Sequence, residues 1–503
     1  MKSTKPETEI KEYLGCYNTL LSLAAAGSAG KFSALASPTL SKQETVSNLH
    51  DYVSNLACTG VNAQFPWVSL VEFLPRIGRL SFQLLCASIF FRVKSLPKSC
   101  IYFRTWLVPK SFQDDTLVDD YFRTLPDELS TSNEVIVSFQ PLDYSLLVEF
   151  GRAARKRNQI ISVGLLSVID ILKLILTYIT SGRAKVVGSY IYNNRDIAPA
   201  INRSLLIDYF RLRSFQAYLD REICRKLRGY ELKAFIYVFE NQSWEKACCA
   251  TLDRKITRLI GYQSSGFSNI FLNFFPTPLD AEKDPMPDTI LTVGALFTRY
   301  LLEHSTYIIP VKTFAALRFV FPSDGKKYFV RKPNPNILKR VLYAFPVQFD
   351  QYGSTLEDLF KVFEGTSIEV HLKFHPVVRI DRIKILRDLP ENFSVIDSVD
   401  MERLRDTYDV VLFDDNSFGL ESLIFGVRSY QYNGYKRISC NRFFYFDLWN
   451  PNIDFIGLVG LKDAIEVGSY EKNYEINHLH NYFNSMYKLN LGACSDLSDV
   501  ILA

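Results

Sequence analysis

The chain lacks the cysteine and histidine patterns on which metal centres and disulfide frameworks depend. Its nine cysteines include no CxxC pair, and an odd number without regular spacing favours free thiols in a reducing compartment. Its six histidines form neither an HExxH motif nor a cluster with cysteine, which argues against a structural zinc site or a zinc hydrolase. No GxGxxG follows a predicted strand, so an epimerase acting on a nucleotide sugar is disfavoured.

The chain also has little excess charge of either sign. Its 58 Lys and Arg residues oppose 54 Asp and Glu residues, giving a net charge of +4, so no strongly basic domain and no nucleic-acid partner are expected. Three glutamates precede the first apolar run, whereas a secretory signal places an apolar stretch directly after a basic start. These features predict a cytoplasmic protein.

What the sequence does contain is typical of a large globular protein. Its 503 residues are 48% hydrophobic and 22% charged, a length that suggests about two to four domains. Aromatic residues make up 14%, which suits surfaces that stack on sugars or face a membrane, although core packing also uses them.

Short apolar runs without clean alternation recur from about residue 98, as expected for strands buried on both faces of a sheet. Amphipathic stretches between them predict crossover helices, and therefore parallel sheets. The runs are residues 100–107, 134–140, 233–240, 258–263, 341–347, 368–375, 393–397, 410–414 and 428–432.

The strands fall into two series separated by the proline-rich residues 274–288, which we interpret as an interdomain linker. The predicted fold class is α/β, with two Rossmann-like domains that face a central cleft and an extra N-terminal helical region. The predicted divisions are a helical region at 1–97, a first domain at 98–285, a second domain at 286–470 and a C-terminal helical segment at 471–503. Ligands of such sheets bind at the carboxyl ends of the strands.

One apolar segment, beginning at Ile160 and ending at Thr180, is long enough to span a bilayer. Asp170 and Lys173 lie within it, and charges at the centre of a membrane span are costly, so we reject a transmembrane helix. A buried domain helix is the favoured interpretation. The alternative is a helix on an anionic membrane surface, because basic residues flank the segment. A second apolar stretch, residues 80–93, is compatible with both.

The first candidate site follows the strand predicted at 233–240. Glu240 would leave a buried strand at its carboxyl end, where a carboxylate can act as general base on a sugar hydroxyl. Asn241 and Gln242 offer amide groups to sugar hydroxyls, and Trp244 offers a stacking face. The alternative is that Glu240 and Asn241 only cap the next helix.

The second candidate site is the GYQSSG segment after the next predicted strand. Gln263, Ser264 and Ser265 place small donors and backbone N–H groups at a strand end, where they could position an acceptor or a phosphate.

The third candidate site ends the strand predicted at 368–375. Pro376 restricts His375 to an extended backbone, and a fixed imidazole can donate to a phosphate oxygen of a nucleotide. Lys373, two residues earlier on the same strand face, would add positive charge.

The fourth candidate site is a strand-to-helix turn. Asn416 or Ser417 is the expected N-cap of a helix whose first N–H groups favour an anion. Glu421, one turn inside, can accept hydrogen bonds from ribose hydroxyls. Asp414 and Asp415 could hold a divalent metal, but they would repel a phosphate, and we expect no metal or other cofactor.

Together these sites resemble bacterial surface-carbohydrate glycosyltransferases of the two-domain GT-B architecture, over about residues 235–430. The pair YVFENQSWEKA and IGYQSSGFS is similar to a group of surface carbohydrate biosynthesis proteins, in which a histidine follows GYQ where this chain has Ser264. The later elements are similar to the histidine-proline motif and the serine-containing turn of capsule sialyltransferases, Kdo transferases and teichoic-acid polymerases. Sialyltransferases carry a serine pair where this chain has Asn416 and Ser417.

The resemblance implies a donor site at His375, Pro376, Lys373 and the turn with Asn416, Ser417 and Glu421. It implies that Glu240 is the base. The expected donor is a CMP-activated acidic sugar such as Kdo or a sialic-acid-like nonulosonate, because a single phosphate needs few cations and no metal. The expected acceptor is a surface glycan or glycolipid of capsule or lipopolysaccharide type.

Two alternatives remain open at this point. One is phosphotransfer from a CDP-alditol, as in teichoic-acid assembly, where the nucleophile attacks phosphorus. The other is a non-catalytic assembly protein held at the inner face of the cell membrane by the segment from Ile160 to Thr180.

Overall fold

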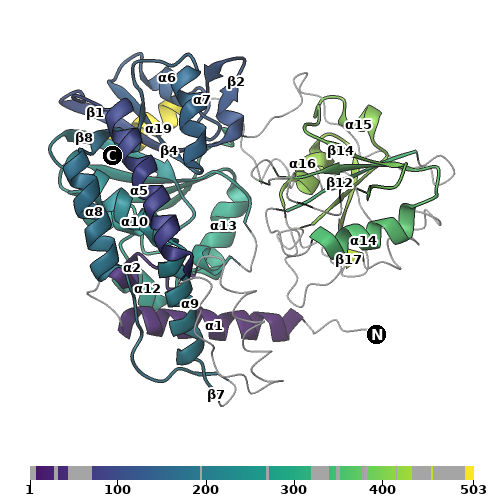
Figure 1. Ribbon diagram of the computed structural model, residues 1–503, viewed down its shortest axis with the longest axis horizontal. Coiled ribbons are helices and arrows are strands. Elements are labelled where there is room, and N and C mark those ends of the chain that lie inside the picture. Colours follow the sequence, from purple (N-terminus) through teal and green to yellow (C-terminus); the bar gives the residue numbers. More distant parts are fainter. Residues whose placement is uncertain are drawn as a thin grey trace. The chain divides into compact units, whose positions relative to one another are not determined.

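The computed structural model forms two compact α/β units (Figure 1). Unit 1 comprises residues 1–264, 270–318 and 488–503, and unit 2 comprises residues 265–269 and 319–487. The residues that the structure describes are 7–27, 32–42, 71–192, 195–267, 271–318, 339–346, 352–375, 378, 383, 386, 388–414, 416–432, 455–456 and 493–502.

Unit 1 is built on a seven-stranded parallel sheet in the order β11-β10-β9-β8-β1-β4-β5. Every residue of β4 and of β10 is buried, which explains their uninterrupted apolar sequences. The strands are β1 (Ser99–Leu107), β4 (Val135–Pro141), β5 (Gln159–Ile161), β8 (Glu231–Val238), β9 (Arg258–Gln263), β10 (Thr289–Thr292) and β11 (Val311–Thr313).

Helices surround this sheet (Figure 1). Two of them, α10 (Phe215–Leu227) and α11 (Ser243–Thr251), pack against each other. The other helices are α1 (Glu7–Gly27), α2 (Phe32–Leu35), α5 (Phe73–Phe90), α6 (Leu125–Leu129), α7 (Leu147–Arg152), α8 (Val168–Ser181), α9 (Ala198–Phe210), α12 (Pro278–Lys283), α13 (Ala295–His304) and α19 (Ala493–Leu502).

Unit 2 repeats the same strand arrangement on a smaller scale. Its parallel sheet has the order β14-β13-β12-β15-β16-β17, and α14 (Tyr352–Phe363) contributes four fully or nearly fully buried side chains to its core: Tyr352, Leu356, Leu359 and Phe363. The strands are β12 (Arg340–Ala344), β13 (Glu369–Lys373), β14 (Phe393–Ile396), β15 (Val410–Phe413), β16 (Arg428–Tyr432) and β17 (Phe455–Ile456), and the further helices are α15 (Leu404–Thr407) and α16 (Phe418–Ile424).

Along the chain, each sheet begins with a central strand. The next two strands pair on one side of it, and the remaining strands pair on the other side. This is the strand order of doubly wound Rossmann-like sheets. The predicted fold class of two Rossmann-like α/β domains is confirmed, and all nine strands predicted from apolar runs are present.

The predicted boundary at residue 285 is wrong. Strands β10 and β11 pair with β9 in the sheet of unit 1, so this unit continues to residue 318. Within the expected linker, Thr277 and Asp280 form the capping box of α12, and Pro278 occupies its first turn. Pro is favoured there because the first N–H groups of a helix need no intrahelical partner.

The described part of the N-terminal region packs on unit 1 instead of forming a region of its own. Asn18 Nδ2 of α1 donates to the carbonyl oxygen of Phe275 over 2.7 Å. The buried Lys42 ammonium forms an ion pair with Asp280, and burial lowers the pKa of Lys42 to about 8 against the opposing effect of that carboxylate. Within the expected C-terminal helical segment, α19 contacts α6 and also belongs to unit 1.

The apolar segment from Ile160 to Thr180 is not one helix. It contains the end of β5, the 3-10 turn η3 (Ser162–Leu165) and most of α8. Asp170 accepts a hydrogen bond from the backbone N–H of Ser167 over 2.9 Å and closes the capping box that begins α8. In the described part of the chain, we find no helix with the length and apolar character that crossing a bilayer requires.

Candidate functional site

Each sheet reverses its strand order once, and ligands of doubly wound sheets bind beyond the carboxyl ends of the strands at that point. In unit 1 the reversal lies between β1 and β8, and in unit 2 it lies between β12 and β15. Glu240 follows β8, and Asn416 follows β15. The two reversal points therefore coincide with two of the four sites predicted from the sequence, one in each unit.

The turn after β8 is organised by Glu245. Its Oε1 accepts from the backbone N–H groups of Glu240 at 2.9 Å and Gln242 at 3.1 Å, and its Oε2 accepts from Asn241 at 3.0 Å. Asn241 adopts a positive φ of 53°, which asparagine tolerates better than most residues. The N-cap of α11 is Gln242, with Glu245 completing the capping box; the capping role considered for Glu240 and Asn241 therefore belongs to other residues.

The side chain of Glu240 is half-buried and is positioned by its neighbours. Gln242 Nε2 donates to Glu240 Oε2, and the indole Nε1 of Trp244 donates to Gln242 Oε1 over 2.8 Å. Asn273 Nδ2 donates to the Glu240 carbonyl oxygen. These bonds fix the carboxylate at the carboxyl end of β8, as a positioned general base requires.

Trp244 and Asn241 do not present their side chains to a ligand, contrary to the sequence-based prediction. Trp244 is 3% exposed, packs edge-on against Trp106, and has the guanidinium of Arg104 3.6 Å from its ring centroid. Asn241 is buried and its Nδ2 donates to the carbonyl oxygen of Asn273 over 2.7 Å. Both residues therefore support the turn.

The GYQSSG segment is also more buried than expected. Gln263 has no exposed surface, and its Oε1 accepts from the backbone N–H of Val293 over 3.3 Å. Contrary to the prediction, its side chain is therefore not presented to an acceptor. Ser264 is buried, and its hydroxyl has no hydrogen-bond partner among the described residues. Ser265 is half-buried.

A buried carboxylate beside β1 was not found from the sequence. Asp119 Oδ1 accepts from the hydroxyl of Thr105 in β1 at 2.9 Å and from the backbone N–H groups of Tyr121 at 2.8 Å and Phe122 at 3.2 Å. Its second oxygen is buried without a hydrogen-bond partner in the described part of the chain. Burial raises the pKa of Asp119 to about 6 despite the three donors.

Asp120 and Tyr121, the two residues after Asp119, interact with charged groups. Asp120 forms ion pairs with Arg123 at 3.2 Å and with Arg318 at 3.4 Å. The Arg318 guanidinium lies 5.0 Å from the ring centroid of Tyr121. Burial raises the pKa of Tyr121 to about 12, and the charge of Glu240 acts in the same direction. The only sequence signal for this cluster is the pair of adjacent aspartates, Asp119 and Asp120, that follows β1.

In unit 2, Asn416 connects the two strands at the reversal point. Its Nδ2 donates to the carbonyl oxygen of Ala344, the last residue of β12, over 2.8 Å. Its Oδ1 accepts from the backbone N–H of Phe418 over 3.0 Å. Ser417 occupies the N-cap position without a capping bond, and its hydroxyl donates to Glu421 Oε1 over 2.7 Å.

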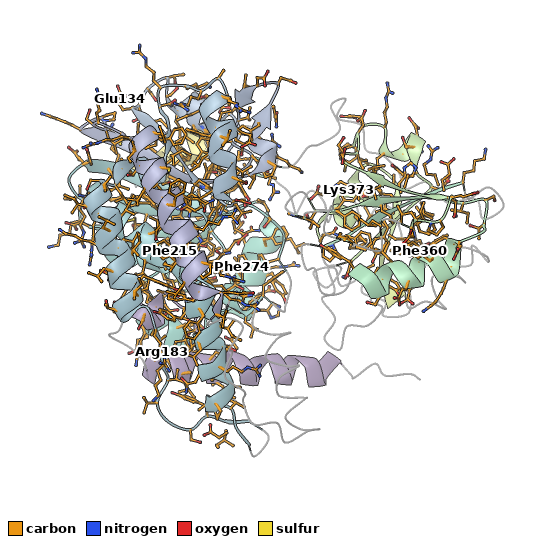
Figure 2. All side chains as sticks on the ribbon, in the orientation of Figure 1. Glu134, Arg183, Phe215, Phe274, Phe360 and Lys373 are labelled. Atoms are coloured by element: carbon orange, nitrogen blue, oxygen red, sulfur yellow. The ribbon has the colours of Figure 1, made fainter. Side chains whose placement is uncertain are left out.

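The end of β13 lies beside the start of α16. Lys373 is the last residue of β13 (Figure 2), and its ammonium is 5.0 Å from the ring centroid of Phe418. His375 follows two residues later and is half-buried. The structure thus brings Lys373 to the turn that holds Asn416, Ser417 and Glu421, whereas Pro376 and Asp415 lie outside the described residues.

In the described part of the chain, no three His, Cys, Asp or Glu side chains group in a way that could hold a metal ion. A cavity of about 480 Å³ lies where α1, α2, α11 and α12 meet in unit 1. Its charged lining residues are Lys246, Asp280, Lys283 and Asp284. Lys246 forms an ion pair with Asp284, and Asp280 forms one with Lys42.

Comparison with known proteins finds no matching family model and no matching curated protein. Similar solved structures include the calicheamicin glycosyltransferase CalG4, at 10% identity and a TM-score of 0.42 over 81% of this chain and 99% of that chain. The UDP-GlcNAc 2-epimerase of Neisseria meningitidis has 11% identity and a TM-score of 0.41, over 80% of this chain and 99% of its own. HepE of Anabaena, solved with UDP-glucose, has 8% identity and a TM-score of 0.42 over the same shares. At identities and TM-scores this low, these similarities say nothing about the function of this chain.

The raised pKa of Asp119 predicts a pH dependence of stability. Between its usual value of 3.8 and about 6, the folded chain keeps a proton that the unfolded chain has lost. The free energy of unfolding therefore falls as pH rises through this window, by up to about 3 kcal/mol at about 1.4 kcal/mol per pH unit. Urea denaturation at pH 4.5 and pH 7 should show Asp119→Asn gaining stability relative to the wild type as pH rises.

Asp127→Asn, which changes an exposed carboxylate of unit 1, is the matched control for this experiment. If the free energy of unfolding had the same pH dependence for Asp119→Asn and the wild type, the pKa of Asp119 would not be raised by folding, and the prediction would be wrong.

Proposed function

We propose that the chain is a nucleotide-sugar-dependent glycosyltransferase of GT-B architecture that acts in the cytoplasm. The observation that carries this proposal is the carboxylate of Glu240, held by Gln242 at the strand-order reversal of unit 1. A positioned carboxylate at this edge of a sheet is suited to accept the proton of a sugar hydroxyl. Unit 2 would bind the donor.

The proposed donor site uses the residues at the reversal of the second sheet. Lys373 supplies a positive charge beside the turn, and Ser417 supplies a hydroxyl. His375, two residues beyond β13, would donate to the donor phosphate. Two basic side chains suit a single phosphate better than a pyrophosphate, which supports a CMP-linked acidic sugar and a reaction without a metal. The acceptor would be a surface glycan or glycolipid.

In the proposed reaction, Glu240 takes the proton of the acceptor hydroxyl as its oxygen attacks the anomeric carbon of the donor. The bond between that carbon and the phosphate oxygen breaks, and its electron pair leaves with CMP. His375 and Lys373 would stabilise the negative charge that develops on the leaving phosphate.

Glu240→Gln should abolish most transfer while leaving nucleotide binding nearly unchanged. An amide keeps the hydrogen bonds of the turn but cannot accept a proton, and loss of a general base lowers rates about 10²–10⁴-fold. The measurement is sugar transfer to a glycan acceptor in parallel with calorimetric titration of CMP. Glu231→Gln, at the exposed amino end of β8, is the control and should transfer at the wild-type rate. Equal loss of transfer and of nucleotide affinity would contradict the role of base.

His375→Ala should weaken CMP binding about 10–100-fold, the value of a hydrogen bond to a charged group. His371→Gln, which changes the other histidine of this segment and faces Tyr408 instead, should bind as the wild type does. Thermal-shift titrations with CMP, UDP, a CMP-linked acidic sugar and a CDP-alditol provide the measurement.

The same titrations distinguish the alternatives. Stabilisation by the CDP-alditol alone would contradict sugar transfer and favour phosphotransfer. No stabilisation by any nucleotide would contradict both activities and favour a non-catalytic assembly protein.

A further inference from the structure

Helix α8 carries apolar side chains on its outer side as well as on its buried side. Ile171, Leu174 and Tyr178 are buried. A second series, spaced by three and four residues and therefore on one helix face, is exposed: Ile169 at 63%, Leu172 at 53%, Leu176 at 63% and Ile179 at 45%. The predicted buried helix is thus buried on one side only.

Helix α5 also carries exposed apolar side chains, and it packs against α8. At one end, Phe73 of α5 contacts Tyr209, with ring centroids 5.1 Å apart, and Tyr209 stacks on Tyr178 near the end of α8. At the other end, Val93 N donates to the carbonyl oxygen of Gly164, just before α8, over 2.9 Å. The helices are therefore antiparallel neighbours. The exposed side chains of α5 are Leu74, Phe82, Ile89 and Phe90.

We call these eight exposed side chains the α5/α8 face. With Val71 and Val168 next to them, they account for ten of the eighteen large apolar side chains exposed in the described part of the chain. Scattered exposed apolar residues are normal, but a concentration on two adjacent helices is typical of a surface that another body covers.

The charges around the α5/α8 face are mainly positive. Helix α5 contains no acidic residue, and Glu72, directly before it, is paired with Arg76. The single acidic residue of α8, Asp170, is bonded to Ser167 and paired with Lys226 over 2.9 Å. Exposed basic side chains lie on the helices and just beyond their ends (Arg183 is labelled in Figure 2): Arg79, Arg92, Lys94, Lys173 and Arg183.

We propose that the α5/α8 face binds the surface of an anionic lipid bilayer. Exposed leucine, isoleucine and phenylalanine side chains enter the acyl boundary while the surrounding arginines and lysines meet lipid phosphates. A second copy of the chain is a poorer partner, because a symmetric dimer would place basic residues against basic residues. Unlike the predicted single helix from Ile160 to Thr180, this surface uses two packed helices. It does not depend on the proposed enzyme activity.

Flotation of the full-length chain with vesicles tests the proposal without any substrate. The chain should bind phosphatidylcholine vesicles containing phosphatidylglycerol, bind pure phosphatidylcholine much more weakly, and dissociate as salt rises. Arg79→Gln with Lys173→Gln should weaken binding about 25-fold, from about fivefold per charge. Leu172→Gln with Leu176→Gln should weaken it at least tenfold.

Ile256→Gln with Ile308→Gln removes two exposed apolar side chains elsewhere in unit 1 and should bind as the wild type does. Three results would overturn the proposal: no binding of the wild type to anionic vesicles, equal binding by the Leu172/Leu176 variant, or a wild-type dimer that this variant dissociates without any vesicle binding. The last result would assign the face to contact between copies of the chain.

Discussion

The carboxyl group of Glu245 holds the turn between β8 and α11, and the position of Glu240 depends on that turn. It accepts the N–H groups of three consecutive residues, from Glu240 to Gln242, as the chain leaves β8 and enters α11. Burial raises the pKa of Glu245 well above its usual value, and the three donors act against that rise. Because a buried N–H without a partner is costly, this one side chain keeps the turn closed and the backbone of Glu240 fixed.

Several features follow from that turn. Gln242, fixed by the capping box, is in place to donate to Glu240. Trp244 donates to Gln242 and also encloses Arg104, whose guanidinium is paired with the buried Asp220 over 3.2 Å. The carboxylate proposed as the base is thus connected through two side chains to a buried ion pair in the core of unit 1. Such a connection restricts its movement, which a positioned base requires.

The same strand order in both units explains why polar side chains gather at corresponding places. In each sheet the first and fourth strands along the chain are neighbours, and the connections that follow them run to opposite sides of that point. The carboxyl ends of these two strands therefore leave room for side chains such as Glu240 or Asn416. Asn416 bonds to both Ala344 and the start of α16, so it fixes the turn that presents Ser417. The α5/α8 face has no part in this geometry, because it lies on helices and not at strand ends.

The sequence was sufficient for nine of the strands and for the Rossmann-like class, since strands buried on both faces leave continuous apolar runs. Strands β5 and β11 were missed because three residues give little pattern. Strand β10 is as long as β14 and β15, but it directly follows the proline-rich residues interpreted as a linker. Missing β10 and β11 put the domain boundary too early. The sequence could not show which polar residues face inward. Trp244, Asn241 and Gln263 are therefore buried against expectation, and Asp119 was missed because only its burial distinguishes it from any other acidic pair.

A crystal structure of the chain with bound CMP would show where the donor nucleotide binds. We expect the phosphate at the carboxyl ends of β12, β13 and β15, within hydrogen-bond distance of the Ser417 hydroxyl and the His375 imidazole. CMP bound instead in the cavity lined by Lys246 and Asp284, or anywhere else away from those strand ends, would contradict this expectation.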